Sequence, residues 1–309
     1  MKIPKSSIVL LAYNHFLETT KPCLLSLIKH TDLIENELII VDNCSSDNTV
    51  NGIEEIISSE KLNIRLIKNS INFGYAAGNN IGIKEARGDI IILLNNDTIV
   101  SRDWLLNLSS IISDHSDLGM LGPVSNSVGN EQMIAIDGIN ELNFEANYKN
   151  HSSHSINLYH TDNLGFFCVA IKKEVIEAVG LLDEEFGIGM FEDTDYCVRT
   201  TEAGFKLAFT EKVFIYHSGS YSFKKITSNE YASLFSRNLE YFQKKHGKNK
   251  WGFSLILKNF MQVLIQQIHN SSDHQLIKNY KLRAKSFENL IGVLTKIEAL
   301  KVDNYKDIF

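Results

Sequence analysis

Short aliphatic runs in the first third of the chain alternate with segments of helical spacing, and this alternation limits the fold more than any other feature. The runs cover residues 8–12, 38–41, 64–67 and 90–94. Parallel strands that are covered on both faces read as unbroken aliphatic runs. The pattern therefore predicts an α/β fold with βαβ units and a parallel sheet. With 309 residues, 44% of them hydrophobic, the chain can form one large α/β domain with an appendage.

The segments between the runs predict the crossover helices. Pro22 suits the first turn of one helix, and residues 48–58 form a second. A third opens in the small-residue stretch 72–80, and Gly88 is expected to end it. Small side chains there let the backbone approach the sheet or a ligand closely.

Downstream of residue 100 the pattern predicts a helix over 104–113 and another over 173–179. Further strands are predicted at residues 118–121, 166–171 and 213–216. The polar stretch 124–162 reads as a long irregular binding loop. From residue 228 the strand signals stop, so we expect a catalytic domain over 1–227 and a helical appendage over 228–309.

Composition excludes several classes of protein. A net charge of -6 argues against nucleic-acid binding, which favours a basic surface. The four cysteines form no CxxC pair, so neither a zinc site nor a disulfide framework is indicated. The first residues lack the apolar core of a signal peptide, and no uncharged apolar stretch reaches membrane-spanning length. These observations predict a cytoplasmic protein.

Carboxylates follow two of the predicted strands directly. Asp42 ends the run 38–41, and Asp97 follows the run 90–94 after Asn95 and Asn96. Ligands of open α/β sheets bind at the carboxyl ends of the strands, so both acids are candidates for ligand binding. A turn after the strand and a helix cap are the structural alternatives.

Glu192, Asp193 and Asp195 enter a predicted helix together, although capping needs only one acid. The N-terminus of a helix favours an ionised carboxylate, which can then accept a proton as a general base. Arg199 lies one turn after Asp195, so an ion pair between them is the alternative for that acid.

His217 ends the predicted strand 213–216. An imidazole and the Asp97 carboxylate together suit Mn²⁺ or Mg²⁺, which complete their coordination with phosphate oxygens and water. A structural histidine with satisfied hydrogen bonds is the alternative.

Several motifs in this order resemble the inverting family 2 glycosyltransferases with the GT-A fold, a mostly parallel sheet flanked by helices. Among them, the chain is most similar to bacterial rhamnosyltransferase-like enzymes of surface polysaccharide synthesis. The motifs lie at residues 8–14, 41–47, 72–74, 94–97 and 192–195 and at His217.

The resemblance implies a nucleotide-diphosphosugar donor, a divalent metal on its phosphates, and a hydroxyl of a growing glycan, free or lipid-linked, as acceptor. It favours uridine or deoxythymidine diphosphosugars. It assigns to donor binding Ala12, Tyr13, Asn14, Asp42, Asn72, Gly74, Asn95, Asn96 and Asp97.

The same resemblance gives roles to the remaining candidates. Asp97 is the final acid of the family's DxD motif and binds the metal, and His217 completes the metal site or contacts the diphosphate. Asp193 matches the catalytic base, while Glu192 and Asp195 shape the acceptor site. The first acid of the DxD motif is an amide here, Asn95, which can bind a ribose hydroxyl but adds no charge to the metal site.

The helical tail carries an apolar-rich segment over residues 251–268, preceded by Lys244 and Lys245. A basic edge beside an apolar face predicts peripheral contact with anionic lipid. Packing on the catalytic domain or on a second subunit is the alternative. The apolar spacing from Ile277 to Leu294 fits a helical hairpin or a homodimer seam.

Other functions fit the sequence less well. A sugar nucleotidylyltransferase needs a glycine-rich phosphate loop, and residues 8–16 contain no glycine. A dinucleotide oxidoreductase needs GxGxxG after the first strand. A non-catalytic nucleotide-sugar-binding or scaffolding homologue stays open, although Asp97 and Asp193 speak against it.

Overall fold

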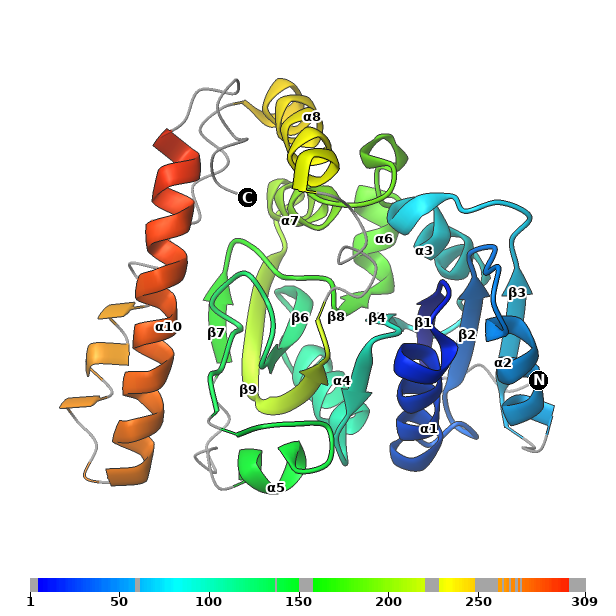
Figure 1. Cartoon of the computed structure of the whole chain (residues 1–309), viewed down its shortest axis with the longest axis horizontal. Helices are drawn as coiled ribbons and strands as arrows, with labels where there is room; N and C mark the ends of the chain where they lie inside the picture. Colours follow the sequence, from blue (N-terminus) through cyan, green and yellow to red (C-terminus); the bar gives the residue numbers. More distant parts are fainter. Residues whose placement is uncertain are drawn as a thin grey trace.

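The computed structural model describes residues 5–58, 62–136, 138–149, 158–219, 228–247 and 261–299, except for 263, 267, 270, 271 and 273. Figure 1 shows its helices and strands along the chain. Its strands are β1 (Ser6–Ala12), β2 (Glu37–Asp42), β3 (Ile64–Lys68), β4 (Ile90–Asn95), β5 (Thr98–Val100), β6 (Leu118–Ser125), β7 (Leu158–Thr161), β8 (Cys168–Lys172) and β9 (Lys206–His217). Its helices are η1 (Phe16–Thr20), α1 (Lys21–His30), α2 (Thr49–Ser58), α3 (Gly74–Glu85), α4 (Trp104–Asp114), α5 (Phe144–Lys149), α6 (Lys173–Val179), η2 (Glu184–Phe186), α7 (Glu192–Glu202), α8 (Ser228–His246) and α10 (His274–Ala299).

One mixed sheet organises the described part of the chain. The strand order is β3-β2-β1-β4-β8-β6-β9-β5, and β7 pairs with β9. Strands β3, β2, β1 and β4 are parallel, as the aliphatic runs predict, while β8 runs antiparallel to both β4 and β6. The predicted α/β fold class is confirmed.

Apolar side chains of alternate strand residues enter two cores on opposite faces of the sheet. Ile8 and Leu10 point toward α1, α2 and α4, whereas Val9 points toward α3, α6 and α7. All three side chains are fully buried. Burial on both faces explains why the strand reads as an unbroken aliphatic run.

The register of the parallel strands brings their carboxyl ends to one edge of the sheet. Leu11 of β1 pairs with Val41 of β2 on one side and with Asn95 of β4 on the other. The residues that follow these strands, such as Tyr13 and Asn43, therefore meet at that edge.

The antiparallel part of the sheet departs most from the sequence prediction. Strand β9 spans twelve residues, although only its last part was predicted. The polar stretch 124–162, expected to be irregular, contains α5 and all of β7, and β5 was not predicted. Helix α3 ends at Glu85 rather than at Gly88. Gly88 serves another purpose, because a Cβ atom there would lie 2.7 Å from the Ser6 backbone.

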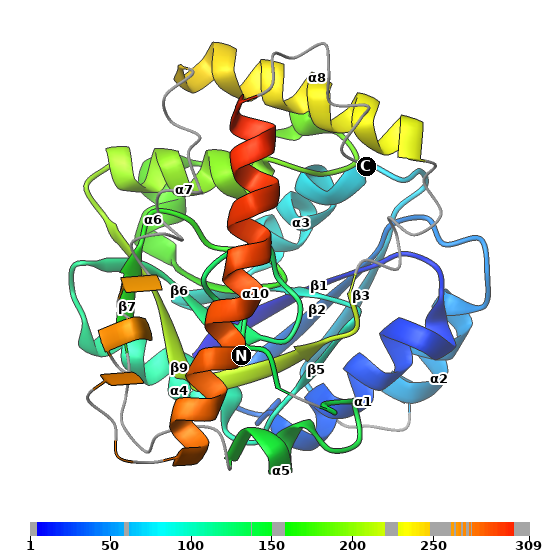
Figure 2. The ribbon, with the colours of Figure 1, turned by 60° about the vertical axis from the view of Figure 1, so that its left-hand side comes forward.

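The C-terminal helices pack on the sheet domain, and Figure 2 shows α10 crossing it beneath α8. Leu239 and Phe242 of α8 join a buried cluster with residues near α7, and Tyr280 and Phe287 of α10 join the core on the α3 side of the sheet. Helices α8 and α10 therefore pack on the sheet domain. Of the predicted apolar segment 251–268, residues 251–260, 263 and 267 lie outside the described residues. Among the described helices, none has the length and apolar character to cross a membrane.

Candidate functional site

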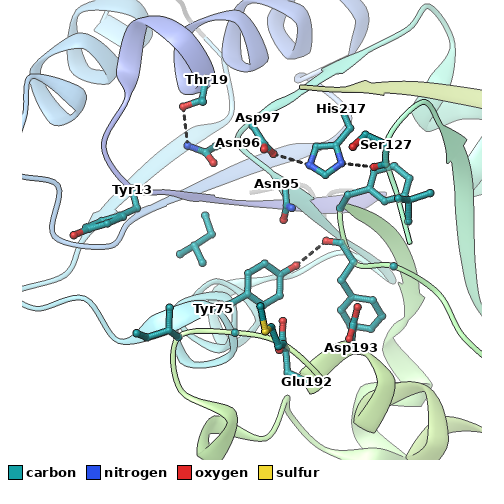
Figure 3. A pocket seen from close by; sticks show the side chains of 18 of the residues that line it. Tyr13, Thr19, Tyr75, Asn95, Asn96, Asp97, Ser127, Glu192, Asp193 and His217 are labelled. Carbon is teal, nitrogen blue, oxygen red and sulfur yellow. Dashed lines mark hydrogen bonds and ion pairs between the residues drawn. The ribbon is translucent and has the colours of Figure 1, made fainter. Parts of the chain in front are cut away.

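A cavity of about 760 Å³ opens at the carboxyl ends of β1, β2 and β4. Figure 3 shows its side chains, with Tyr13 toward one end and Glu192 and Asp193 toward another. Of the predicted site residues, the cavity wall contains Tyr13, Asn72, Gly74, Asn95, Asn96, Asp97, Glu192, Asp193 and His217. The fold thus brings together residues that lie as far apart as 13 and 217 in the sequence.

Asn43 organises one wall of the cavity, although it was not among the predicted site residues. Its Nδ2 donates to Asn72 Oδ1 at 2.8 Å and to the Gly74 carbonyl at 3.1 Å. Its Oδ1 accepts from the Phe73 backbone N–H at 3.1 Å and from Asn69 Nδ2 at 3.0 Å. A buried amide with every group satisfied fixes this wall firmly. Its position directly after a predicted strand was the available signal.

Ala12, Asn14 and Asp42 do not line the cavity, contrary to our prediction. Ala12 is buried and pairs with Asp42 across β1 and β2. Asn14 has a left-handed backbone, with φ of 53°, and its Oδ1 accepts from the Ser46 N–H at 2.8 Å. Asp42 accepts from the Ser45 N–H through Oδ2 at 3.1 Å. These residues shape the loops behind the wall.

Asp97 and His217 face each other at the wall of the cavity. His217 Nε2 lies 3.1 Å from Asp97 Oδ1, and each side chain is at most 10% exposed. The pairing of β5 with β9 sets this contact, since Thr98 and His217 are register partners. The His217 ring also stacks on Phe167, with 5.5 Å between the ring centroids.

The two ring nitrogens of His217 face different groups, since Nε2 lies against the Asp97 carboxylate and Nδ1 against a backbone carbonyl. Nδ1 lies 2.7 Å from the Ser127 carbonyl, which can only accept, so Nδ1 carries the proton. Both Nε2 and Asp97 Oδ1 are buried without a hydrogen-bond partner among the described residues. Burial alone would lower the pKa of His217, but the Asp97 carboxylate outweighs it and raises the pKa.

A hard carboxylate oxygen and an imidazole nitrogen that face each other fit a divalent cation in place of the proton between them. Among the described residues no cluster of three or more acidic, histidine or cysteine side chains could hold a metal by itself. A cation at Asp97 and His217 would therefore need further ligands from phosphate and water, the mode typical of Mg²⁺. Asn95 lines the cavity beside them.

Asn96 has a structural role in addition to its place in the wall. Its Nδ2 donates to Thr20 Oγ1 at 2.9 Å and to Thr19 Oγ1 at 3.2 Å. These bonds tie the turn between β4 and β5 to η1 and hold Asp97 in position.

Glu192 and Asp193 begin α7 and line the cavity. Burial raises the pKa of Glu192 to about 8, and the neighbouring Asp193 carboxylate adds to the effect. Burial also raises the pKa of Asp193, against hydrogen bonds from Thr194, whose N–H donates to Oδ1 at 2.7 Å. Glu192 Oε2 has no hydrogen-bond partner among the described residues. A carboxylate with a raised pKa is a stronger base once ionised.

Asp195 is the clear correction among the predicted acids. Its side chain is fully buried and lies outside the cavity wall. It forms ion pairs with Arg199 at 2.8 Å and Lys245 at 2.6 Å, and its Oδ1 is hydrogen-bonded to His246 Nε2 at 2.7 Å. The carboxylate therefore joins α7 to α8 and does not shape an acceptor site.

The side chains that line the cavity are mostly acidic or uncharged. Its described lining contains no lysine or arginine, and His15 and His217 are its basic residues.

Comparison with known proteins agrees with this geometry. Residues 7–180 match the model of the family described as glycosyl transferase family 2. The O-antigen chain rhamnosyltransferase RfbN of Salmonella typhimurium is 27% identical over 212 residues, which cover 65% of this chain and 63% of RfbN. A Sinorhizobium fredii protein, y4gI, is 25% identical over 264 residues, which cover 78% of this chain and 27% of y4gI. The chain thus spans less than two thirds of the length of these relatives.

Two solved structures share the fold. Mannosyltransferase PcManGT from Pyrobaculum calidifontis, in complex with GDP-Man and Mn²⁺, aligns with a TM-score of 0.59 and 15% identity over 99% of this chain and 86% of that one. The fragment 1–349 of Staphylococcus aureus TarS, in complex with UDP-GlcNAc, aligns with a TM-score of 0.56 and 15% identity over 98% of this chain and 90% of that fragment. The sheet, the residues at its edge and the family match lead to one conclusion: this chain belongs to glycosyl transferase family 2.

Proposed function

We propose that the protein is an inverting glycosyltransferase that moves one sugar from a nucleotide diphosphosugar to a hydroxyl of a growing glycan. The observation that carries the proposal is the placement of two acidic groups around one cavity. Asp97 with His217 can hold a cation beside a diphosphate, and Asp193 can accept a proton from an acceptor. A single-displacement transfer needs both functions in one site.

The donor occupies the end of the cavity that Tyr13, Asn72 and Gly74 line. The Tyr13 side chain is partly exposed, at 38%, and offers a ring on which a nucleobase can stack. Asn95 offers an amide to a ribose hydroxyl. TarS and PcManGT are bound to UDP-GlcNAc and GDP-Man, which supports a nucleotide sugar and leaves the base open. Uridine and deoxythymidine diphosphosugars are our first candidates.

In the proposed reaction, the Asp193 carboxylate takes the proton of the acceptor hydroxyl. The acceptor oxygen forms a bond to the anomeric carbon from the face opposite the diphosphate, and the bond from that carbon to the diphosphate oxygen breaks. The anomeric configuration inverts, and the nucleoside diphosphate leaves with the bond's electron pair. A divalent cation held by Asp97 and His217 supplies electrostatic stabilisation of that leaving group.

Glu192 has a supporting role in this scheme. With a pKa of about 8 it is mostly protonated at neutral pH, so it can donate a hydrogen bond into the cavity. Its proton also lets Asp193 carry the single negative charge of the pair. The acceptor, in this proposal, lies between Glu192 and Asp193 and the donor sugar.

The acceptor class follows from the relatives and stays a proposal. RfbN is named an O-antigen chain rhamnosyltransferase, which supports a surface glycan, free or lipid-linked. A cytoplasmic location, peripheral membrane contact through the C-terminal helices and a homodimer also stay predictions.

Thermal unfolding with UDP, dTDP, GDP and CDP, each with Mn²⁺ or with EDTA, tests the donor site. A nucleotide at about 100 times its Kd adds roughly 2.7 kcal/mol to stability. We expect one nucleotide to raise the Tm only with Mn²⁺, and transfer from the matching sugar nucleotide to give a product of inverted anomeric configuration by NMR. No stabilisation by any nucleotide, with or without metal, would overturn the proposal.

A further inference from the structure

The segment 187–191, between η2 and α7, has an unusual backbone. Gly187 and Gly189 have φ values of 67° and 152°, and Met190 and Phe191 have φ values of 77° and 74°. Two consecutive residues with side chains in the left-handed region are conformationally costly, so surrounding contacts must hold them there. Ile188, Gly189 and Met190 line the cavity, and α7 with Asp193 begins directly after this segment.

Asn238 of α8 supplies those contacts. Its Nδ2 donates to the carbonyls of Gly189 at 2.8 Å, Phe186 at 3.0 Å and Met190 at 3.0 Å. Its Oδ1 accepts from Arg237 Nε at 2.9 Å. The side chain is fully buried, so water does not compete for these bonds.

Arg237, the neighbour of Asn238 on α8, also hydrogen-bonds this part of the chain. Its Nη2 donates to the Phe186 carbonyl at 3.1 Å, alongside Asn238. On the opposite side, the Tyr75 N–H donates to the Ile188 carbonyl at 3.2 Å. The segment is thus held between α3, which carries Tyr75, and α8.

Apolar contacts between α8 and this region are separate from the amide contacts. Leu239 and Phe242 are fully buried against Phe186 and Phe191, with Val198 nearby. These apolar side chains stabilise the packing of α8, but they do not hydrogen-bond the carbonyls that Asn238 binds. The two kinds of contact can therefore be tested apart.

We propose that Asn238 is a positioning residue for sugar transfer. By binding the carbonyls of Phe186, Gly189 and Met190, it fixes the direction in which α7 presents Asp193 to the cavity. The inference rests on the proposed function, because it assumes that Asp193 accepts the acceptor proton. It gives one residue of α8 an indirect role in transfer, although Asn238 touches neither donor nor acceptor.

Asn238→Leu tests the proposal, since leucine has a similar volume and no hydrogen-bond donor. Misplacement of a reacting group by about 1 Å costs on the order of 100-fold in rate. We expect kcat to fall by about 10- to 100-fold and the Kd for the nucleotide with Mn²⁺ to change less than about twofold, because the donor end of the cavity is held by Asn43. Asn238→Ser keeps one donor and should give an intermediate kcat.

Leu239→Ala is the matched control on the same helix, because it weakens the apolar packing and leaves the amide contacts in place. We expect it to lower the Tm at least as much as Asn238→Leu while kcat stays near the wild-type value. Equal losses of kcat in the two variants at equal loss of Tm would overturn the proposal, and so would an unchanged kcat in folded Asn238→Leu. If Asn238→Leu does not fold, the losses of kcat and of Tm are compared between Asn238→Ser and Leu239→Ala, and the same outcomes decide.

Hydrogen exchange gives a readout that needs no donor. Peptides covering residues 186–193 should exchange faster in Asn238→Leu than in Leu239→Ala, and unchanged exchange would count against the positioning role. Absence of transfer by the wild-type protein with every donor would instead count against the proposed function, which separates the two failures.

Discussion

His217 Nε2 lies 3.1 Å from Asp97 Oδ1, and neither atom has a hydrogen-bond partner among the described residues. With the proton on Nδ1 toward Ser127, two atoms that both accept hydrogen bonds face each other in a buried place. Such a pair is stable only when a proton or a cation lies between the two atoms. The pairing of β5 with β9 brings the two residues together although they are far apart in the chain, and in the proposed function a divalent cation takes the place of the proton.

Asp97→Asn should weaken the binding of nucleotide with Mn²⁺ by at least about tenfold, because an amide offers the cation no negative charge. The substitution keeps the size of the side chain, so the fold should be retained. Isothermal titration with Mn²⁺ and with EDTA gives the measurement. Nucleotide binding in EDTA is the internal control and should be unchanged. Equal Mn²⁺-dependent affinity in the two proteins would show that the cation binds elsewhere.

Asp193→Asn should lower kcat by about 100- to 10,000-fold, the range typical for loss of a general base. Asparagine retains an Oδ1 that can accept from the Thr194 N–H, so the start of α7 should stay folded. The Kd for the nucleotide should stay within about twofold of the wild-type value. Transfer at the wild-type rate by a folded Asp193→Asn protein would refute the assignment of the base.

The raised pKa of Glu192 makes the free energy of unfolding depend on pH in a way that can be measured. Burial raises the pKa of Glu192 from the ordinary 4.5 to about 8. The protonated form is therefore favoured by folding, and its contribution to stability is complete below about pH 4.5 and lost as the pH rises through about 8. Glu192→Gln should remove this dependence, so that the variant gains stability relative to the wild type between pH 6 and pH 9.

Urea denaturation at the two pH values measures the effect of Glu192→Gln. Glu174→Gln, which removes a carboxylate that is 55% exposed, is the control for the loss of one charge. A parallel fall in stability of the wild type and Glu192→Gln from pH 6 to pH 9 would show that Glu192 is already ionised at pH 6 in the folded protein.

The parallel half of the fold was predictable because its strands are aliphatic runs, of which β1, β2 and β4 are buried on both faces. The half formed by β5 to β9 was less predictable, since its strands depend on partners distant in sequence. β5 has three residues, and β7 pairs with β9 across about fifty residues in a stretch of polar composition. Local pattern carries no signal for such pairing.

The site was predictable where a residue type met a strand end or a helix start. Asp97, Asp193 and His217 line one cavity, as the motifs predicted. Asp195 follows the same local pattern, but its partners Lys245 and His246 lie on α8, about fifty residues away. The spacing of residues along α7 predicted only the ion pair of Asp195 with Arg199. The role of an acid within such a cluster thus depends on tertiary contacts that the local sequence does not contain.

Arg283 should be the residue on which the docking of α10 most depends. It is fully buried, and its guanidinium binds the Glu211 carboxylate, the Met133 carbonyl at 2.8 Å and the Glu131 carbonyl at 2.6 Å. Arg283→Met leaves a carboxylate and two carbonyls without this donor, so we expect the free energy of unfolding to fall by about 3–5 kcal/mol. Urea denaturation measures the loss. The double variant with Glu211→Gln should recover part of it, whereas no recovery would show that the Glu211 pair is not the main loss.

Gly74 should be intolerant of any side chain, because a Cβ atom there would lie 2.1 Å from the Gly187 carbonyl oxygen and its φ is 84°. Gly204 is the matched control: its φ is 91°, but no atom lies within 4 Å of the position of a Cβ. Gly204→Ala should lose about 1–3 kcal/mol of stability from backbone strain alone and keep its kcat. Gly74→Ala should lose at least as much and should also displace the segment 187–191, so its kcat should fall by on the order of 10- to 100-fold. Steady-state kinetics beside urea denaturation separates the two effects. Equal kcat in both variants would mean that contact between α3 and the segment 187–191 does not control the position of Asp193.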